Sequence, residues 1–318
     1  MLSSRMQRSQ QAGLPVRAGL HPTGLYIALR NIGPENLQDA FMQETITRVS
    51  ASETVVHVAR DEVGIAAPDN APAGIIFHVA RCGSTLISQS LKKLDNLVVY
   101  AEPQAVNEIL APPHRWPRAD LVAAIRALGG AFARHAGRPY VLKLSSWNSL
   151  FCDIVAEAFP ETNWVLTLRD PVEVGVSLLR QPPGWLGGST EASRSLIEIM
   201  APENRPTSPE ERVARAYGAF CAAAARLDPS RGRLVDYETL PAAVWETVAP
   251  RFSLPVDARQ RAEIEQGARV NAKAPLGSSG EYAPDAATKQ STASLELRGA
   301  IDRFARPHLE RLVRLHAR

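Results

Sequence analysis

A short segment, residues 81–86, has the side chains and the position of an anion-binding loop. It contains Arg81, Gly83, Ser84 and Thr85 and follows a short apolar run. Glycine permits a tight turn, and the first amides of a helix that begins here have no intrahelical acceptor. Amides, hydroxyls and a guanidinium together favour a phosphate or sulfate group. The alternative is an ordinary strand-to-helix turn with a surface arginine. The nucleoside triphosphatase pattern G-x-x-x-x-G-K-[ST] is absent.

A second arginine stands in a similar position. Arg169 follows another apolar run, and Ser177 lies eight residues after it. Pro171 suits the first turn of a helix, so Ser177 would lie about two turns into that helix. If the turn is tight, the arginine and the serine converge on a second anion. The alternative is a helix start capped by Asp170, with a solvated arginine. Two anion sites together would suit a nucleoside that carries phosphates at both ends.

Short apolar runs alternate with segments of helical spacing, and the residues above follow such runs. This alternation predicts an α/β fold of three layers, with a central parallel sheet of about five strands and helices on both faces. Ligands of such sheets bind beyond the carboxyl ends of the strands. Of the histidines, His78 lies inside the first run and is expected to pack in the core, whereas His135 is expected to face solvent. The runs are residues 74–80, 97–100, 140–144, 164–168 and 233–236.

The composition is that of an ordinary globular chain: 318 residues, 45% hydrophobic and 22% charged. It excludes wholesale disorder and a collagen-like fibre, and no apolar stretch is long enough for a spanning helix. Lysine and arginine number 36 against 33 acids, and a formal charge of +3 does not indicate a nucleic-acid partner. The 3 cysteines include no CxxC pair and indicate neither a zinc site nor disulfides. We therefore expect a reducing, cytoplasmic compartment.

The chain divides unequally. Residues 1–70 are expected to be a partly ordered N-terminal extension of unknown role, and residues 71–318 to carry the α/β domain. Residues 270–292 are rich in Gly, Ser, Pro and Ala, which predicts a long loop before a C-terminal helix. Its lysines, Lys273 and Lys289, are either lid residues over a bound anion or, more simply, solvated loop lysines.

In order and spacing, these motifs resemble those of the sulfotransferases that use PAPS, 3′-phosphoadenosine 5′-phosphosulfate. Residues 81–86 resemble the loop for the 5′-phosphosulfate, and residues 169–177 resemble the 3′-phosphate motif. Tyr237 and Glu238 resemble a later element whose tyrosine lies beside the nucleotide. The resemblance spans roughly residues 74–240. It implies the P-loop-like sulfotransferase fold, PAPS as co-substrate and no metal. The nucleotide-binding residues that it implies are Arg81, Cys82, Gly83, Ser84, Thr85, Leu86, Arg169, Ser177 and Tyr237.

The sequence departs from the cytosolic members of that family at three positions. Arg81 stands where they have lysine, as it does in Golgi tyrosylprotein sulfotransferases and many bacterial homologues. Leu86 stands where they place an aromatic ring on adenine, so that contact is missing or supplied elsewhere. Ser145 follows the third apolar run, where they carry a histidine base, and that base cannot be transferred to this chain.

The resemblance implies a carboxylate base instead. Glu102 follows the second apolar run, precedes Pro103 and lies 21 residues after Arg81, a spacing similar to that of the catalytic glutamate in tyrosylprotein sulfotransferases. Lys143 matches a family lysine close to the sulfuryl group and, with Arg81, would steady the departing phosphate. For Glu102 and Lys143, a purely structural ion pair is the alternative.

Three functions are compatible with these residues. The first is transfer of a sulfuryl group from PAPS to a hydroxyl or amine. The second is a small-molecule kinase, which would need ATP and magnesium, but no lysine follows the glycine of the loop and no metal-holding aspartate is clear. The third is a nucleotide-binding protein without catalysis. The acceptor, whether small molecule, glycan or peptide, stays open, and so does the oligomeric state.

Overall fold

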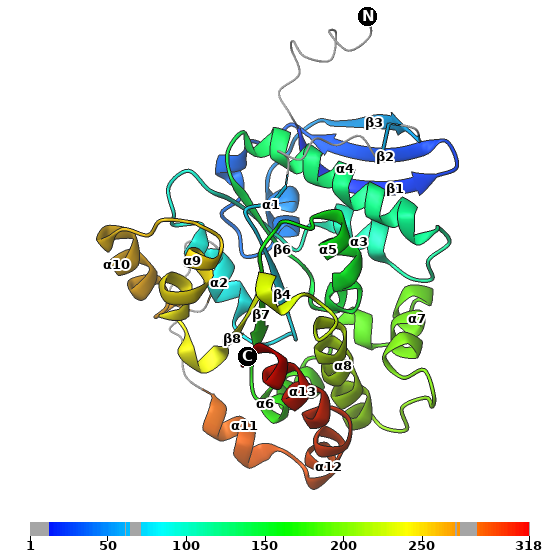
Figure 1. Cartoon of the computed structure of the whole chain (residues 1–318), viewed down its shortest axis with the longest axis vertical. Coiled ribbons are helices and arrows are strands. Elements are labelled where there is room, and N and C mark those ends of the chain that lie inside the picture. The colour runs from blue at the N-terminus through cyan, green and yellow to red at the C-terminus, as the bar shows by residue number, and fades with distance from the viewer. Residues whose placement is uncertain (1–12, 61, 64–70, 271, 274–284, 318) are drawn as a thin grey trace, which may run out of the picture.

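The computed structural model describes residues 13–60, 62–63, 71–270, 272–273 and 285–317. At its centre lies a sheet of five parallel strands in the order β5-β6-β4-β7-β8 (Figure 1). The predicted α/β fold with a central parallel sheet is confirmed, and each strand coincides with one of the five apolar runs. The strands are β4 (Gly74–His78), β5 (Val98–Ala101), β6 (Tyr140–Lys143), β7 (Trp164–Leu168) and β8 (Gly232–Asp236).

Helices cover both faces of this sheet. They are α2 (Ser84–Leu91), α3 (Gln104–Leu110), α4 (Arg118–Ala136), α5 (Cys152–Ala158), α6 (Pro171–Arg180), α7 (Glu191–Met200), α8 (Pro209–Ala224), α9 (Ala249–Arg251), α10 (Ala258–Gly267), α11 (Ala286–Thr292), α12 (Leu295–Phe304) and α13 (Arg306–His316). Prolines open α6 and α8, whose first turns need no amide from that residue.

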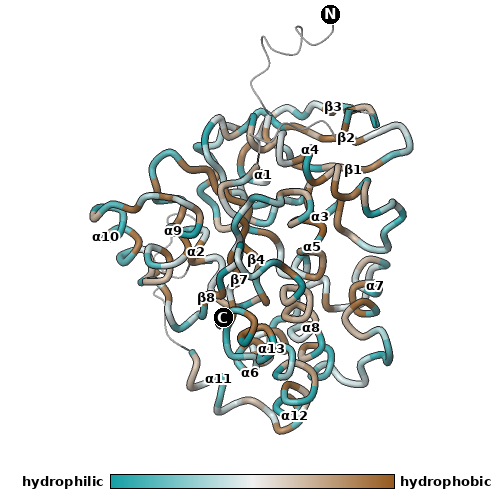
Figure 2. Tube along the Cα trace, in the orientation of Figure 1, coloured by the Kyte–Doolittle hydropathy of each residue, from teal (hydrophilic) through white to brown (hydrophobic). Residues whose placement is uncertain are grey.

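Each face of the sheet has its own apolar core, because successive strand residues point to opposite sides. Ile76, Val99 and Val165 pack with α2 and α10 on one face. Phe77 and Tyr100 belong to the larger core on the other face, which contains residues of α4, α5, α8 and α12. The strands form the brown centre of the trace in Figure 2. A sheet that is apolar on both sides is what parallel strands under two helical layers require.

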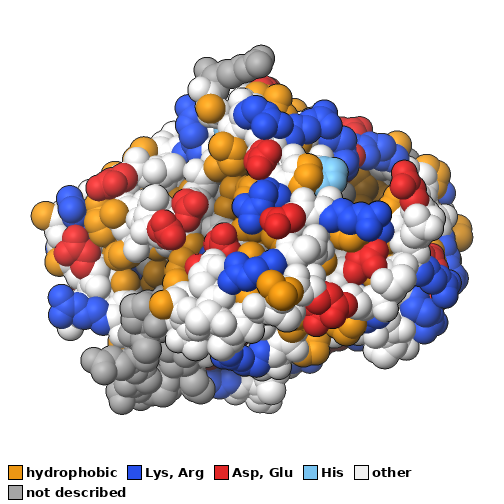
Figure 3. Space-filling model, turned by 90° about the horizontal axis from the view of Figure 1, so that it is seen from below, with side chains coloured by type: hydrophobic (Ala, Val, Ile, Leu, Met, Phe, Trp, Pro, Cys, Tyr) orange, Lys and Arg blue, Asp and Glu red, His pale blue; other side chains and the backbone are white. Residues whose placement is uncertain are grey.

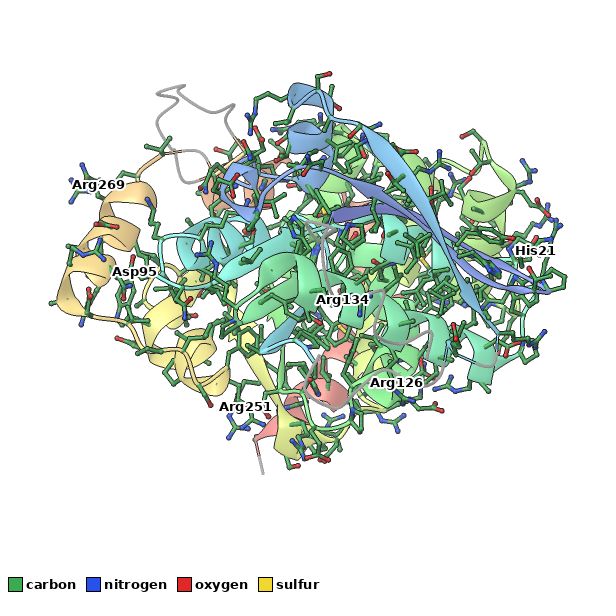
Figure 4. All side chains as sticks on the ribbon, turned by 90° about the horizontal axis from the view of Figure 1, so that it is seen from above. His21, Asp95, Arg126, Arg134, Arg251 and Arg269 are labelled. Atoms are coloured by element: carbon green, nitrogen blue, oxygen red, sulfur yellow. The ribbon has the colours of Figure 1, made fainter. Side chains whose placement is uncertain are left out.

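The N-terminal part of the chain forms a second, smaller sheet. β1 (Leu14–His21), β2 (Gly24–Arg30) and β3 (Glu53–Ala59) are antiparallel, and α1 (Met42–Arg48) lies between β2 and β3 in sequence. β1 packs against α3 and α4. Figure 4 shows His21 at the tip of the β1–β2 hairpin, at the far end of the molecule from Arg269.

A buried histidine joins this sheet region to α4. Nε2 of His135 donates to the carbonyl of Ile32 at 2.7 Å, and its Nδ1 lies 2.7 Å from the hydroxyl of Tyr100. The expectation that His135 faces solvent is therefore wrong, since only 6% of the residue is exposed. The polar residues around it on α4 concealed a position on the inner face of that helix.

The region predicted to be a loop, residues 270–292, is partly helical. Residues 286–292 form α11, so the loop prediction is wrong there, and residues 271 and 274–284 lie outside the described part. The predicted C-terminal helix is two helices, α12 and α13, that meet at Ala305. Proline at position 307 explains the break, because it has no amide to continue the preceding helix.

The outer face over α11–α13 carries basic and acidic side chains interspersed, as expected of a solvated surface (Figure 3). Among the helices that the structure describes, none combines the length and the apolar character needed to cross a membrane.

Close packing of α8 on α12 gives a test of this arrangement. A methyl group on Gly218 of α8 would overlap the carbonyl oxygen of Phe304, whereas a methyl group on Gly299 of α12 would meet nothing within 4 Å. We expect Gly218→Ala to lower the free energy of unfolding by about 1–3 kcal/mol through overpacking. Gly299→Ala, on an exposed helical position, should raise it by about 0.5–1 kcal/mol. Urea unfolding of both variants measures the difference, and equal effects would contradict the packing described here.

Candidate functional site

The carboxyl ends of all five parallel strands lie along one edge of the sheet. His78 of β4 pairs with Thr167 of β7, and Leu168 pairs with Asp236 of β8. On the other side of β4, Ala101 of β5 pairs with Lys143 of β6. The loops that leave β4 and β7 run to opposite sides of the sheet. Ligands of α/β proteins bind in the crevice that such a reversal opens.

A cavity of about 960 Å³ lies at this edge. It is at the upper end of the size of small-molecule sites, so it has room for a nucleotide and part of a second molecule. The structure brings together every residue that the sequence singled out for binding or catalysis. Those that line the cavity are Arg81, Cys82, Gly83, Ser84, Thr85, Leu86, Glu102, Lys143, Arg169, Ser177 and Tyr237.

The loop after β4 reaches its shape through strained backbone conformations. Ala80 and Arg81 have φ of 70° and 50°, and Gly83 has φ of 84° before the first residue of α2. A left-handed conformation costs a non-glycine residue about 1–3 kcal/mol. Successive turns of this kind, followed by a helix start, gather backbone amides around a concave anion site. Burial raises the pKa of the Cys82 thiol to about 11, so the thiol is protonated at neutral pH and is a poor nucleophile.

Tyr237 connects the two predicted anion-binding segments. A Cβ on Gly83 would lie 2.8 Å from the Tyr237 ring and 2.6 Å from Leu240, so only glycine permits this contact. The guanidinium of Arg169 lies 4.0 Å from the centre of the same ring. A cation over an aromatic ring is stabilised by the ring's negative face. The strand-to-helix loop and Arg169 therefore share one aromatic wall.

Arg169 is almost wholly buried, with 6% of its side chain exposed. Its Nε donates to Glu173 at 2.7 Å, and its Nη2 donates to Asp285 at 2.7 Å. The hydroxyl of Tyr217, on α8, donates to the Arg169 carbonyl at 2.8 Å. Ser177 lines the same cavity one helical turn beyond Glu173. The alternative of a solvated Arg169 is wrong, because a buried guanidinium held by two carboxylates is a fixed positive centre.

Glu102 and Lys143 form an ion pair at the opposite part of the cavity. The ammonium of Lys143, fully buried, donates to Oε1 of Glu102, and the hydroxyl of Ser145 donates to Oε2 at 3.4 Å. Burial alone would raise the pKa of Glu102, but the Lys143 charge and hydrogen bond outweigh it, and the pKa lies below its ordinary value. Glu102 has a left-handed φ of 57°, and its amide donates to the Lys143 carbonyl at 2.7 Å.

His78 lies beneath this pair and is buried, as expected of a core residue. Its Nε2 donates to the Leu144 carbonyl at 2.9 Å, and its Nδ1 accepts from the amide of Ala80 at 3.2 Å. Burial and the charge of Lys143 lower its pKa to about 3. The neutral ring therefore supports the loop after β4, and its Nε2 lies 3.8 Å from Oε1 of Glu102 at the cavity wall.

Arg81 extends across the cavity toward α6. Its Nη2 donates to both the carbonyl and the side-chain oxygen of Gln181, each at 3.1 Å. Lys273 also lines the cavity, and part of this residue is exposed to solvent. Partial burial of its ammonium, together with the positive charges of Arg81 and Lys143, lowers its pKa to about 8. Lys273 is thus linked electrostatically to the part of the cavity that holds Glu102, Arg81 and Lys143.

One lining residue was missed by the sequence analysis, and another, Lys289, was named there only as a lid lysine or a solvated loop lysine. Phe41, just before α1, lies with its ring 5.1 Å from the Lys143 ammonium, although nothing in its local sequence marks it as functional. Lys289 is buried and paired with Asp285 at 2.7 Å, so the simpler reading of a solvated loop lysine is wrong. Both residues reach the cavity only through tertiary packing.

Positive charge predominates in the cavity. Seven cationic side chains and four carboxylates line it in the described part of the chain. The cations are Arg81, Lys143, Arg169, Arg180, Arg269, Lys273 and Lys289, and the carboxylates are Glu102, Glu238, Glu265 and Asp285. Such a balance attracts a ligand with several negative charges.

A scan against protein-family models finds no match, and neither does a search of curated proteins. Among solved structures, the chain is similar to the sulfotransferase domain of the curacin biosynthetic pathway, with 15% identity over 74% of this chain and 97% of that one and a TM-score of 0.45. The sulfotransferase domain of a Synechococcus olefin synthase has 15% identity, coverage of 74% and 94%, and a TM-score of 0.46. A mouse sulfotransferase complexed with PAP has 8% identity, coverage of 81% and 92%, and a TM-score of 0.42. All three are sulfotransferases, the family that the sequence motifs resemble.

The buried neutral His78 should make stability fall in mild acid. Its pKa is about 3 in the folded chain against 6.5 without burial, so the unfolded chain binds more protons between these values. On acidification from pH 7 to 5 we expect this residue to cost about 2 kcal/mol of stability. His78→Gln keeps an N–H donor but does not titrate, and its denaturant midpoint should depend less on pH. His135 and His316, whose pKa values are also lowered by burial, contribute to the slope that remains. An unchanged slope in the variant would show that His78 is not buried in neutral form.

Proposed function

We propose that this protein transfers a sulfuryl group from PAPS to a hydroxyl or amine acceptor. One observation carries the proposal: the loop of residues 81–86, the segment from Arg169 to Ser177, and the Glu102–Lys143 pair line a single cavity. The motif resemblance assigns these three groups to the 5′-phosphosulfate, the 3′-phosphate and the reacting centre. A donor with anionic groups at both ends of a nucleoside needs two cationic sites, separated by no more than the length of the donor.

The donor would lie across the sheet edge. Its phosphosulfate would meet the first turn of α2, where Ser84, Thr85 and the backbone amides supply hydrogen bonds. Its 3′-phosphate would approach Arg169 and Ser177, and the nucleoside would lie beside Tyr237. Hydrogen bonds that involve a charged group contribute about 1.5–3 kcal/mol each, so both ends add to affinity.

The chemistry is an in-line displacement at sulfur. The acceptor oxygen or nitrogen forms a bond to sulfur as the bond from sulfur to the bridging oxygen breaks, and PAP leaves with that electron pair. Glu102 takes the acceptor's proton. Arg81 and Lys143 stabilise the negative charge that develops on the departing phosphate.

The ion pair between Glu102 and Lys143 gives the donor a second role. A carboxylate bound to an ammonium is a weak base, because its pKa is lowered. When the phosphosulfate arrives beside Lys143, its charge competes for the ammonium and the carboxylate becomes more basic. Glu102 would therefore become an effective base only when the donor is bound beside Lys143.

We further propose that residues 71–318 carry the transferase, with the N-terminal extension, residues 1–70, shaping the acceptor side. Phe41 belongs to that extension and is the described residue of it that lines the cavity. Its ring lies beside Lys143, and so next to the reacting centre. The cavity wall is thus completed by a part of the chain outside the parallel sheet.

The hypothesis that this protein is a kinase is less well supported. The loop of residues 81–86 has no lysine after its glycine, which a P-loop kinase uses to hold the outer phosphates. A non-catalytic nucleotide-binding protein would not need Glu102 at the cavity, yet this carboxylate lines it beside a buried lysine.

Ligand-induced stabilisation tests the donor. We expect PAP to raise the melting temperature more than ADP or ATP with magnesium does, since a ligand at 100 times its Kd adds about 2.7 kcal/mol of stability. Arg169→Ala should abolish the preference for PAP over 5′-AMP. Arg134→Ala, on α4 and outside the cavity wall, serves as the control (Figure 4). Stabilisation by ATP with magnesium but not by PAP would refute the proposal.

Substitution of Glu102 tests the base. Glu102→Gln should reduce turnover by about 10²–10⁴ without weakening PAP binding, because the general base is lost while the anion sites remain. PAP release from PAPS, measured with a panel of phenols, alkyl alcohols and amines, provides the rate. Glu108→Gln, which removes the charge of a partly buried carboxylate that is paired with Arg17 outside the cavity wall, is the matched control. Because the pKa of Glu102 is lowered in the free protein, the acid limb of kcat/KM for the wild type should lie below the pH at which an ordinary glutamate titrates, and the acid limb of kcat, with donor bound, should lie at higher pH. A near-normal rate in the Glu102 variant would remove its assigned role.

A further inference from the structure

The anion site at Arg169 is already filled by a carboxylate of the chain itself. Asp285 places Oδ1 at 2.7 Å from Nη2 of Arg169 and Oδ2 at 2.7 Å from the ammonium of Lys289. Each oxygen thus takes one cation, as two oxygens of a phosphate would. The charges of these two partners, together with their hydrogen bonds, more than offset the burial of Asp285 and lower its pKa, so it is ionised.

The charges around this point are balanced. Arg169 and Lys289 supply two positive charges, and Glu173 and Asp285 supply two negative charges. A phosphate monoester brings about −1.5 to −2 at neutral pH. Addition of that group beside the Asp285 carboxylate would leave an excess of negative charge in a largely buried place, which is strongly unfavourable. The phosphate and the Asp285 carboxylate therefore exclude each other.

Of these groups, the Asp285 carboxylate is the one that can move out of the site into solvent. Its side chain is 46% exposed, whereas those of Arg169 and Lys289 are 6% and 7% exposed. Gln290 anchors α11 by donating to Asp170 at 2.9 Å, and α11 carries Lys289. The two cations are held by buried structure, and Asp285 precedes the first residue of the helix.

We propose that Asp285 is an internal counter-anion that occupies the 3′-phosphate site and is displaced by the donor's phosphate. This inference rests on the proposed function, and it assigns a specificity role to Asp285 and a ligand role to Lys289. A singly charged group cannot outcompete a tethered carboxylate of equal charge, because the tether gives Asp285 a high effective concentration. A phosphate dianion carries the additional charge that displaces it. The site thereby admits a phosphate dianion and rejects a singly charged group.

Binding of 3′-AMP, 5′-AMP and PAP to the full chain, measured by calorimetry, tests this role. Asp285→Asn removes the charge and keeps the size, so the 3′-phosphate no longer has to displace an anion. We expect the Kd for 3′-AMP and for PAP to fall by about five- to tenfold and the Kd for 5′-AMP to stay unchanged. The gain should vanish in the Arg169→Ala, Asp285→Asn double variant. Asp302→Asn on α12, which breaks a surface pair with Arg306 of α13, should change none of the three constants.

Other results of these binding measurements would contradict the inference. If Asp285 instead orients Lys289 for the ligand, Asp285→Asn will weaken 3′-AMP binding, and the inference is wrong. Equal Kd values for PAP in the wild type and in Asp285→Asn would also overturn it while leaving the proposed function intact. If neither protein binds PAP or 3′-AMP, the proposed function falls, and this inference falls with it.

Discussion

A buried guanidinium is the constraint on which the second half of the cavity depends. Removing a charge from water is costly unless it is paired and hydrogen-bonded. Arg169 meets this requirement with Glu173 on α6, Asp285 before α11, and the ring of Tyr237 after β8. Segments far apart in sequence are therefore drawn to one point. The same requirement makes this point a natural place for a ligand anion, because an exposed carboxylate is the weakest member of the set.

In the other half of the cavity a buried charge is also paired with a carboxylate, but that carboxylate is held more firmly. Lys143 is fully buried, and Glu102 is the carboxylate that neutralises it. Here the partner is held by a strained backbone and by the hydroxyl of Ser145 rather than by a half-exposed helix end. The two ion pairs thus differ in how easily each carboxylate can move. The proposed mechanism uses this difference, since one carboxylate must stay to accept a proton and the other must yield its place.

Backbone strain is concentrated where these charges meet. Ala80, Arg81 and Glu102 are three of the five non-glycine residues with positive φ in the described part of the chain. Strained conformations persist only when the surrounding structure fixes them. Here the amide of Ala80 is held by His78, and the amide of Glu102 donates to the Lys143 carbonyl at 2.7 Å. The parallel sheet thus stabilises loops that would not adopt these shapes alone.

The sequence alone determined the central sheet and the chemical types at its edge. A parallel strand buried on both faces must be apolar throughout, and that local requirement left five recognisable runs. Residues that follow such runs meet at one edge whatever the details of packing, which is why Arg81, Glu102 and Arg169 could be placed together in advance. The N-terminal sheet was not recognised, because its half-buried antiparallel strands mix buried and exposed residues and leave a weaker pattern than strands that are buried throughout.

Only the tertiary structure decided which charges are paired. Asp285 lies 116 residues from Arg169, and Glu102 lies 41 residues from Lys143. Phe41 and Lys289 reach the cavity from segments whose local sequence indicates a surface position. Electrostatic and packing energies depend on distance in space, and separation along a chain of this length does not determine that distance. The residue types at the site could therefore be predicted from the sequence. Their ion-pair partners could not, and neither could the position of Asp285 beside Arg169.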